Sequence, residues 1–142
     1  MNIYPASQED YSNAISLLEK NKLPTADLHS GTQLFVLEDE GEIAGTIAAE
    51  YNYNDALLRS LSVSEDKRNL GLGIQLVNFI EDYLQKQGIQ HIYLLTTTAA
   101  GFFAKRGYNQ TDRQAVPDFI RQTTEFASVC PSSATVMKKQ LQ

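Results

Sequence analysis

The chain has 142 residues, 42% of them hydrophobic and 20% charged, and a formal net charge of −5. This length predicts a single domain, residues 1–142, whose core needs no disulfide or metal staple. So acidic a chain lacks the basic stripe that binds nucleic acid, and its longest apolar run is too short to cross a membrane. One cysteine, Cys130, excludes an intrachain disulfide, and the first residues lack a signal-peptide pattern. We therefore expect a cytoplasmic protein without nucleic-acid or membrane partners.

The N-terminal half predicts one helix followed by a run of antiparallel strands. Ile3–Pro5 is typical of a short strand, and Ser7 of a helix cap that precedes apolar residues at helical spacing as far as Lys20. Tight turns at 38–41 and 52–55 then separate further predicted strands, at residues 34–37, 43–51 and 56–63. Strands joined by such short turns pair antiparallel.

The C-terminal half predicts a change to a parallel pair. Apolar residues recur at helical spacing from Leu72 to Leu84, and Gly88 follows where the helix would end. A β-branched and aromatic run over 89–97 is the next strand, so the order strand, helix, strand predicts a βαβ crossover. The remaining predicted elements are a helix at 99–105, a strand at 108–111, a helix at 117–127 and a strand at 134–138. Together they predict an α+β (mixed α/β) fold, a mixed sheet flanked by helices.

An anion site is predicted where the 56–63 strand leads into the long helix. Gly71 and Gly73 open that helix, and the first turn of a helix carries unpaired N–H groups and partial positive charge. Glycines let a diphosphate approach this backbone closely, and Arg68 would add one full charge beside it. A glycine-rich helix start without a ligand is the alternative interpretation of the same residues.

Two other phosphate motifs are excluded. A Walker loop ends in Gly-Lys-Ser/Thr, whereas Gly73 is followed by Ile74-Gln75. The dinucleotide fingerprint requires a third small residue where Leu76 stands, and an acid about 20 residues further on. Residues 93–96 contain no acid. The dinucleotide fingerprint also requires a parallel sheet, whereas hairpins precede this helix.

The remaining pattern resembles the acyl-CoA loop of the GNAT N-acetyltransferase superfamily, Arg/Gln-x-x-Gly-x-Gly/Ala, which here reads Arg-Asn-Leu-Gly-Leu-Gly over 68–73. Residues 61–63 resemble the family's central strand, and residues 102–108 its Phe/Tyr-x-x-x-Gly-Phe segment. The resemblance implies an acetyl-CoA-dependent N-acetyltransferase that modifies the amine of a small molecule, without a metal, as a monomer or homodimer. The acetyl-CoA contacts that it implies are Leu61, Ser62, Val63, Arg68, Asn69, Leu70, Gly71, Leu72, Gly73, Ile74, Thr96 and Phe103.

The C-terminal half also resembles a narrower group, the arsenic-resistance N-acetyltransferases. The similar segments include Leu94–Ala99, Ala115–Pro117 and Cys130–Ala134. This resemblance implies an acceptor that is an amino acid or an amino-acid analogue linked to arsenic resistance. Trivalent arsenic prefers thiolates, but a single cysteine is a poor site for it, and a small buried hydrophobe is the better interpretation of Cys130.

Two positions depart from the family pattern. Phe103 stands where family members often place a tyrosine that protonates the leaving thiolate, and phenylalanine has no proton to donate. A threonine or a water can substitute for that tyrosine, or the thiolate can leave unassisted, because a thiol with a pKa near 8.5 is a fair leaving group. Thr96 stands where asparagine is common, and its hydroxyl can serve the pantetheine or a water. The departure at Phe103 keeps open a non-catalytic acyl-CoA sensor or interaction module, and a structural protein without CoA affinity is the third interpretation.

The acceptor side of the reaction needs a base, a polarised carbonyl and a binding group. Glu50, late in the second hairpin strand, is the candidate base, and an exposed hairpin-end carboxylate is its alternative. A backbone N–H near Leu61 or Ser62 is expected to hold the carbonyl oxygen. Guanidinium forks match planar anions, so the candidates for binding a substrate carboxylate, with surface salt bridges as the alternative, are Arg59, Arg113 and Arg121.

Overall fold

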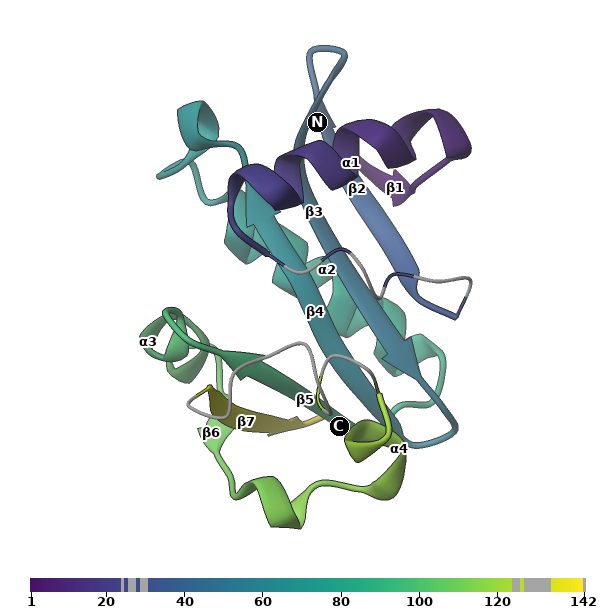
Figure 1. Cartoon of the computed structure of the whole chain (residues 1–142), viewed down its shortest axis with the longest axis vertical. Helices are drawn as coiled ribbons and strands as arrows, with labels where there is room; N and C mark the ends of the chain where they lie inside the picture. The colour runs from purple at the N-terminus through teal and green to yellow at the C-terminus, as the bar shows by residue number, and fades with distance from the viewer. Residues whose placement is uncertain (24, 26–27, 29–30, 124–125, 127–133, 142) are drawn as a thin grey trace.

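The computed structural model describes residues 1–141 except 24, 26–27, 29–30, 124–125 and 127–133. Its elements in chain order are β1 (Asn2–Pro5), α1 (Gln8–Lys20), β2 (Gln33–Asp39), β3 (Glu42–Tyr51), β4 (Asp55–Val63), η1 (Glu65–Lys67), α2 (Leu72–Lys86), β5 (His91–Thr96), α3 (Ala100–Ala104), β6 (Asn109–Gln110), η2 (Arg113–Ala115), α4 (Asp118–Arg121) and β7 (Thr135–Gln140). The described strands form one seven-stranded sheet in the order β1-β2-β3-β4-β5-β7-β6 (Figure 1).

The predicted mixture of pairings is confirmed. Strands β1 to β4 pair antiparallel as a meander, and β4 pairs parallel with β5 after the α2 crossover. The final strand, β7, inserts antiparallel between β5 and β6. The fold is therefore α+β, with the parallel pair at the centre of the sheet.

The two long helices cover opposite faces of the sheet (Figure 1). Ala14 of α1 packs against Val36 and Ala48, whereas Leu76 and Ile80 of α2 belong to the larger core on the other face. The sequence predicts both stripes because their apolar residues recur at helical spacing. The start of α1 is also as predicted, since the side chain of Ser7 accepts a hydrogen bond from the Asp10 N–H and completes a capping box.

The predicted helix over 117–127 is wrong in length. The α-helix α4 spans only Asp118–Arg121 and follows Pro117, while residues 124–125 and 127 lie outside the described part of the chain. The hydroxyl of Thr123 donates to the Ile120 carbonyl at 2.7 Å and accepts from the Phe126 N–H at 3.3 Å. The Thr123 side chain thus links Ile120 to Phe126 beyond the end of α4, as is typical of a threonine that competes with backbone groups for hydrogen bonds. The strand predicted at 108–111 is likewise shorter, Asn109–Gln110.

Candidate functional site

Strands β4 and β5 separate after a short parallel stretch. Their register runs from Asp55↔His91 to Leu57↔Tyr93, although β4 continues to Val63. Among the described residues, the second half of β4 therefore has no registered partner in β5, and Figure 1 shows the two strands diverging toward their carboxyl ends. This divergence exposes one backbone edge of a central strand to the space between β4 and β5.

A bulge changes the direction of β4 at Ser60. The register with β3 shifts between Thr46↔Ser62 and Ala48↔Arg59, and Ser60 has a positive φ of 59°. An extra residue of this kind lies outside the regular ladder and turns the strand. The buried hydroxyl of Thr46 donates to the Ser60 carbonyl at 2.8 Å. The bulge shifts by one residue the alternation of β4 side chains between the two faces of the sheet. Leu58 and Leu61 therefore contact the same core.

The predicted glycine-rich loop forms one wall of a pocket. Gly71 is the N-cap of α2 with φ +78°, and Asn69 also has a positive φ of 67°. The pocket measures about 300 Å³, and its described lining is Val63, Lys67, Arg68, Asn69, Gly71, Leu72, Gly73, Ile74, Phe102 and Arg106. The N-terminal turn of α2 lines the pocket, and its N–H groups lack intrahelical partners. The pocket is therefore suited to an anion. Of the predicted acetyl-CoA residues, those that do not line it are Leu61, Ser62, Leu70, Thr96 and Phe103.

Arg68 lines this pocket, but its guanidinium is bound to other parts of the protein. Its Nη2 donates to Asn21 Oδ1 at 2.6 Å, and its Nε donates to the Val63 carbonyl at 3.3 Å. Asn21 is the C-cap of α1, and its Nδ2 donates to Ser62 Oγ and to the same Val63 carbonyl. Arg68 therefore joins the end of α1 to the end of β4.

Phe103 is a core residue in the structure. It is 4% exposed and lies edge-on to Phe102 and Tyr108, with ring centroids 5.1 and 5.3 Å away. The neighbouring Phe102 lines the pocket instead, with the guanidinium of Arg106 over its ring. Sequence reasoning missed Phe102 and Arg106. The available signal was the pair of adjacent phenylalanines, of which a helix can bury only one on a given face.

Glu50 and Arg59 form a buried ion pair. Glu50 Oε2 lies 3.0 Å from Arg59 Nη1, and the side chains are 8% and 0% exposed. Arg59 is in register with Ala48, which packs against α1, and Glu50 lies two residues further along β3 on the same face. Glu50 is thus not an exposed hairpin-end carboxylate, and Arg59 is already paired with a carboxylate of the protein.

The other predicted site residues make local contacts. Thr96 Oγ1 accepts from the Ala99 N–H at 2.9 Å, which leaves its own hydrogen to be donated elsewhere. Arg113 lies over the Phe126 ring, 5.3 Å from its centroid. Arg121 Nη2 donates to the carbonyls of Gln114 and Val116 and so holds the segment before α4. Cys130 lies outside the described residues.

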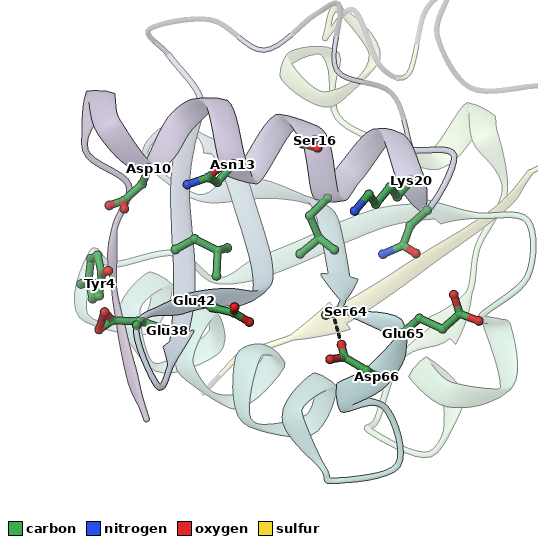
Figure 2. Close-up of a pocket in the computed structure, with 14 residues that line it drawn as sticks. Tyr4, Asp10, Asn13, Ser16, Lys20, Glu38, Glu42, Ser64, Glu65 and Asp66 are labelled. Carbon is green, nitrogen blue, oxygen red and sulfur yellow. Dashed lines mark hydrogen bonds between the residues drawn. The ribbon is translucent and has the colours of Figure 1, made fainter.

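A larger groove, of about 730 Å³, lies between α1, the β2–β3 turn and the start of η1. Figure 2 shows Lys20 among a set of carboxylates, which are Asp10, Glu38, Glu42, Glu65 and Asp66. The hydrogen bond from Ser64 lowers the pKa of Asp66 below its ordinary value, so this carboxyl is ionised at neutral pH. Such a lining repels a diphosphate, and the smaller pocket at α2 is therefore the candidate anion site.

The comparison with protein families agrees with this geometry. The family described as acetyltransferase (GNAT) domain matches residues 30–110, which is more than half of the chain. The chain belongs to this family. The matched region includes β3, β4, the glycine-rich loop, α2 and β5, which are the elements that build the pocket and the divergent strands.

Individual relatives extend the comparison. An uncharacterized N-acetyltransferase of Chlorobaculum tepidum is 36% identical over 87 residues, 61% of this chain and 56% of that protein. An amino-acid acetyltransferase of Pseudomonas fluorescens is 33% identical over 88 residues, 60% of this chain and 20% of that protein. The chain therefore matches only part of either relative. The structure of N-acetylglutamate synthase from Neisseria gonorrhoeae, complexed with coenzyme A and N-acetyl-glutamate, has the same fold. Its TM-score is 0.84 at 20% identity, over 99% of this chain and 35% of that one.

The described residues contain no cluster of three or more histidine, cysteine or carboxylate side chains that could hold a metal ion. Within the same part of the chain, no helix is both long and apolar enough to cross a membrane.

Proposed function

We propose that this chain is an acetyl-CoA-dependent N-acetyltransferase that acts on the amine of a small molecule. The observation that carries the proposal is the pocket at the first turn of α2, beside the divergent ends of β4 and β5. Membership of the GNAT family supports it independently. The diphosphate of acetyl-CoA would lie against the backbone of Gly71–Ile74, and the pantetheine along the open edge of Leu61–Val63.

Acetyl-CoA supplies the acetyl group as a thioester, and transfer joins the carbonyl carbon to the acceptor nitrogen and releases CoA as a thiol. In this proposal Glu50 accepts the proton that the amine loses, directly or through a water. The backbone N–H of Leu61 or Ser62 holds the carbonyl oxygen as it gains negative charge. The hydroxyl of Thr96 donates to the pantetheine or to a water near the leaving sulfur. The sulfur takes up one proton as CoA leaves.

The acceptor that we propose is an amino acid or an amino-acid analogue. The amino-acid acetyltransferase of Pseudomonas fluorescens, and the N-acetyl-glutamate held by the Neisseria gonorrhoeae enzyme, support this class. Arg59 is completely buried and paired with Glu50, so the predicted arginines that we propose for the acceptor carboxylate are Arg113 and Arg121. The proposed link to arsenic resistance rests on the resemblance of the C-terminal half. Arsenic and phosphorus analogues of amino acids are therefore included among the acceptors to be tested.

A second candidate function is a sensor that binds acyl-CoA without turnover. The specific observation in its favour is Phe103, which occupies the core at the position where a tyrosine acid is common. Tyr108 does not replace that acid, since its hydroxyl donates to Glu81 Oε2 at 2.8 Å and burial raises its pKa.

One experiment separates these functions. Acetyl-CoA is first titrated into the purified chain by calorimetry, and thiol release is then followed at alkaline pH, where acceptor amines are neutral, with glutamate, aspartate and their phosphorus and arsenic analogues. We expect binding and a release of thiol that depends on the amine. Binding without release for every amine would favour the sensor. A folded sample without any binding would overturn both functions.

A further inference from the structure

Among the residues that the structure describes, three cationic side chains line the pocket at the start of α2, although the chain as a whole is acidic. Two of them are directed to acceptors of the protein itself. Lys67 Nζ lies 3.1 Å from Asp39 Oδ2, and Arg68 donates to Asn21 and to the Val63 carbonyl. These contacts direct both side chains toward acceptors of the protein, although each cation has more N–H groups than these contacts use.

The third cation, Arg106, is held differently. Its guanidinium carbon lies 4.1 Å from the centroid of the Phe102 ring, and its Nη1 donates to the Phe102 carbonyl at 2.8 Å. Its Nε is buried and has no hydrogen-bond partner in the part of the chain that the structure describes. A buried N–H of a charged group without an acceptor is costly, and most such groups in folded proteins are paired. An anionic oxygen in the pocket would satisfy it.

Phe102 places this guanidinium beside the first turn of α2. A side-chain carbon built at Gly73 would lie 3.6 Å from Phe102 Cζ, so the ring that supports Arg106 contacts the helix start itself. Arg106, Gly71, Gly73 and Ile74 all line the same pocket. A diphosphate bound at the helix N-terminus would therefore lie within reach of the Arg106 side chain.

We infer that Arg106, and not the motif arginine Arg68, is the side chain that binds the diphosphate of CoA. This inference rests on the proposed function, because it requires CoA in this pocket. A guanidinium presents two parallel N–H groups to two phosphate oxygens, a geometry that lysine does not offer. The Phe102 ring and carbonyl hold the fork in place before the ligand arrives, which reduces the entropy lost on binding. Arg68 is then a positioning residue, which ties α1 to β4.

The test is calorimetric titration of the full chain with CoA and with 3′-dephospho-CoA, which share the diphosphate but differ in the ribose phosphate. We expect Arg106→Gln to raise the Kd of both ligands about tenfold, the loss of one charge-assisted contact. Arg68→Gln should raise either Kd less than Arg106→Gln does. Lys105→Gln is the matched control, since it removes the same charge from the exposed neighbour of Arg106, and it should leave both Kd values within twofold.

Each other outcome overturns the inference. A loss confined to CoA would move the contact to the 3′-phosphate, and an unchanged affinity of Arg106→Gln for both ligands would remove Arg106 from the site. A larger effect of Arg68→Gln would return the contact to the motif arginine. If Arg106→Gln does not unfold cooperatively, Arg106→Lys is used, for which we expect about a threefold rise because the charge remains but the fork is lost. An unchanged Kd for Arg106→Lys would overturn the inference that the Arg106 fork binds the diphosphate. If the unsubstituted chain binds neither ligand, the proposed function fails with the inference, whereas binding by the unsubstituted chain isolates a failure of Arg106 alone.

Discussion

Glu50 Oε2 accepts a hydrogen bond from Arg59 Nη1 at 3.0 Å, and the Arg59 side chain is completely buried. The two residues are diagonal neighbours on β3 and β4, and Arg59 Nε also donates to Ser60 Oγ at 3.2 Å, at the bulge. One ion pair thus connects the proposed base to the residue that turns the central strand. A change at Glu50 is therefore expected to affect both folding and catalysis.

Glu50→Gln should lower the free energy of unfolding by roughly 3 kcal/mol, because it removes the charge of one partner from a buried pair. Urea denaturation measures this, and thiol release measures the accompanying loss of activity. Glu42→Gln, at an exposed carboxylate on the same strand, should change neither quantity. A destabilised Glu50→Gln variant that keeps full activity when folded would show that Glu50 supports the structure alone and is not the base.

Gly73→Val should weaken CoA binding strongly while the chain remains folded. Gly73 has an ordinary helical conformation, and a side-chain carbon there would make van der Waals contact with Phe102, so the added methyl groups fill the pocket without straining the backbone. We expect the Kd to rise at least tenfold and the melting temperature to change little. Gly101→Ala is the control, since nothing lies within 4 Å of the added carbon. Retained affinity in Gly73→Val would remove the ligand from this pocket.

Thr46→Val should destabilise the bulge. It removes the hydroxyl that donates to the Ser60 carbonyl at 2.8 Å and leaves a buried carbonyl without that donor at nearly constant volume. We expect the free energy of unfolding to fall by about 1–3 kcal/mol in urea denaturation. Thr97→Val, at an exposed threonine, should have an effect below about 0.5 kcal/mol. Equal effects of the two substitutions would show that the Thr46 hydroxyl does not support the bulge.

The stability of the protein should fall at high pH, in part through Tyr83. Burial, reinforced by the hydrogen bond with the Tyr51 hydroxyl at 2.7 Å, raises the pKa of Tyr83 to about 12. In the unfolded chain this pKa is about 10. Between about pH 10 and 12 the folded state therefore binds more protons than the unfolded state, and the free energy of unfolding falls as pH rises. Below about pH 10 both states hold the proton, and this contribution is fully present.

Urea denaturation at pH 9, 10 and 11 checks this dependence. Tyr83→Phe should flatten the fall between pH 10 and 11, because phenylalanine has no proton to lose. Tyr53→Phe is the matched control, since Tyr53 is 90% exposed, and it should leave the pH profile unchanged. The same slope in Tyr83→Phe and the unsubstituted chain would assign the fall to other groups.

The local elements of this fold could be predicted because their signals lie within a few residues of one another. The helix cap at Ser7 and the helix start at Gly71 were both confirmed. The longer helix predicted after Pro117 was wrong, since the hydroxyl of Thr123 competes with the backbone for the bonds that would extend it. The predicted anion pocket coincides with a real concavity, and its ligand remains a prediction.

The sequence by itself determined the order of elements, the mixed sheet, the glycine-rich entry to α2 and the family resemblance, because each depends on spacing along the chain. Only the tertiary structure decided that Arg59 neutralises Glu50, that Arg68 is bound to the end of α1, and that Arg106 shares the pocket with Gly73. These pairs of residues lie 9, 47 and 33 positions apart in the chain. Their geometry depends on how far β4 and β5 diverge and where the bulge turns β4, and no local pattern of residue types specifies either.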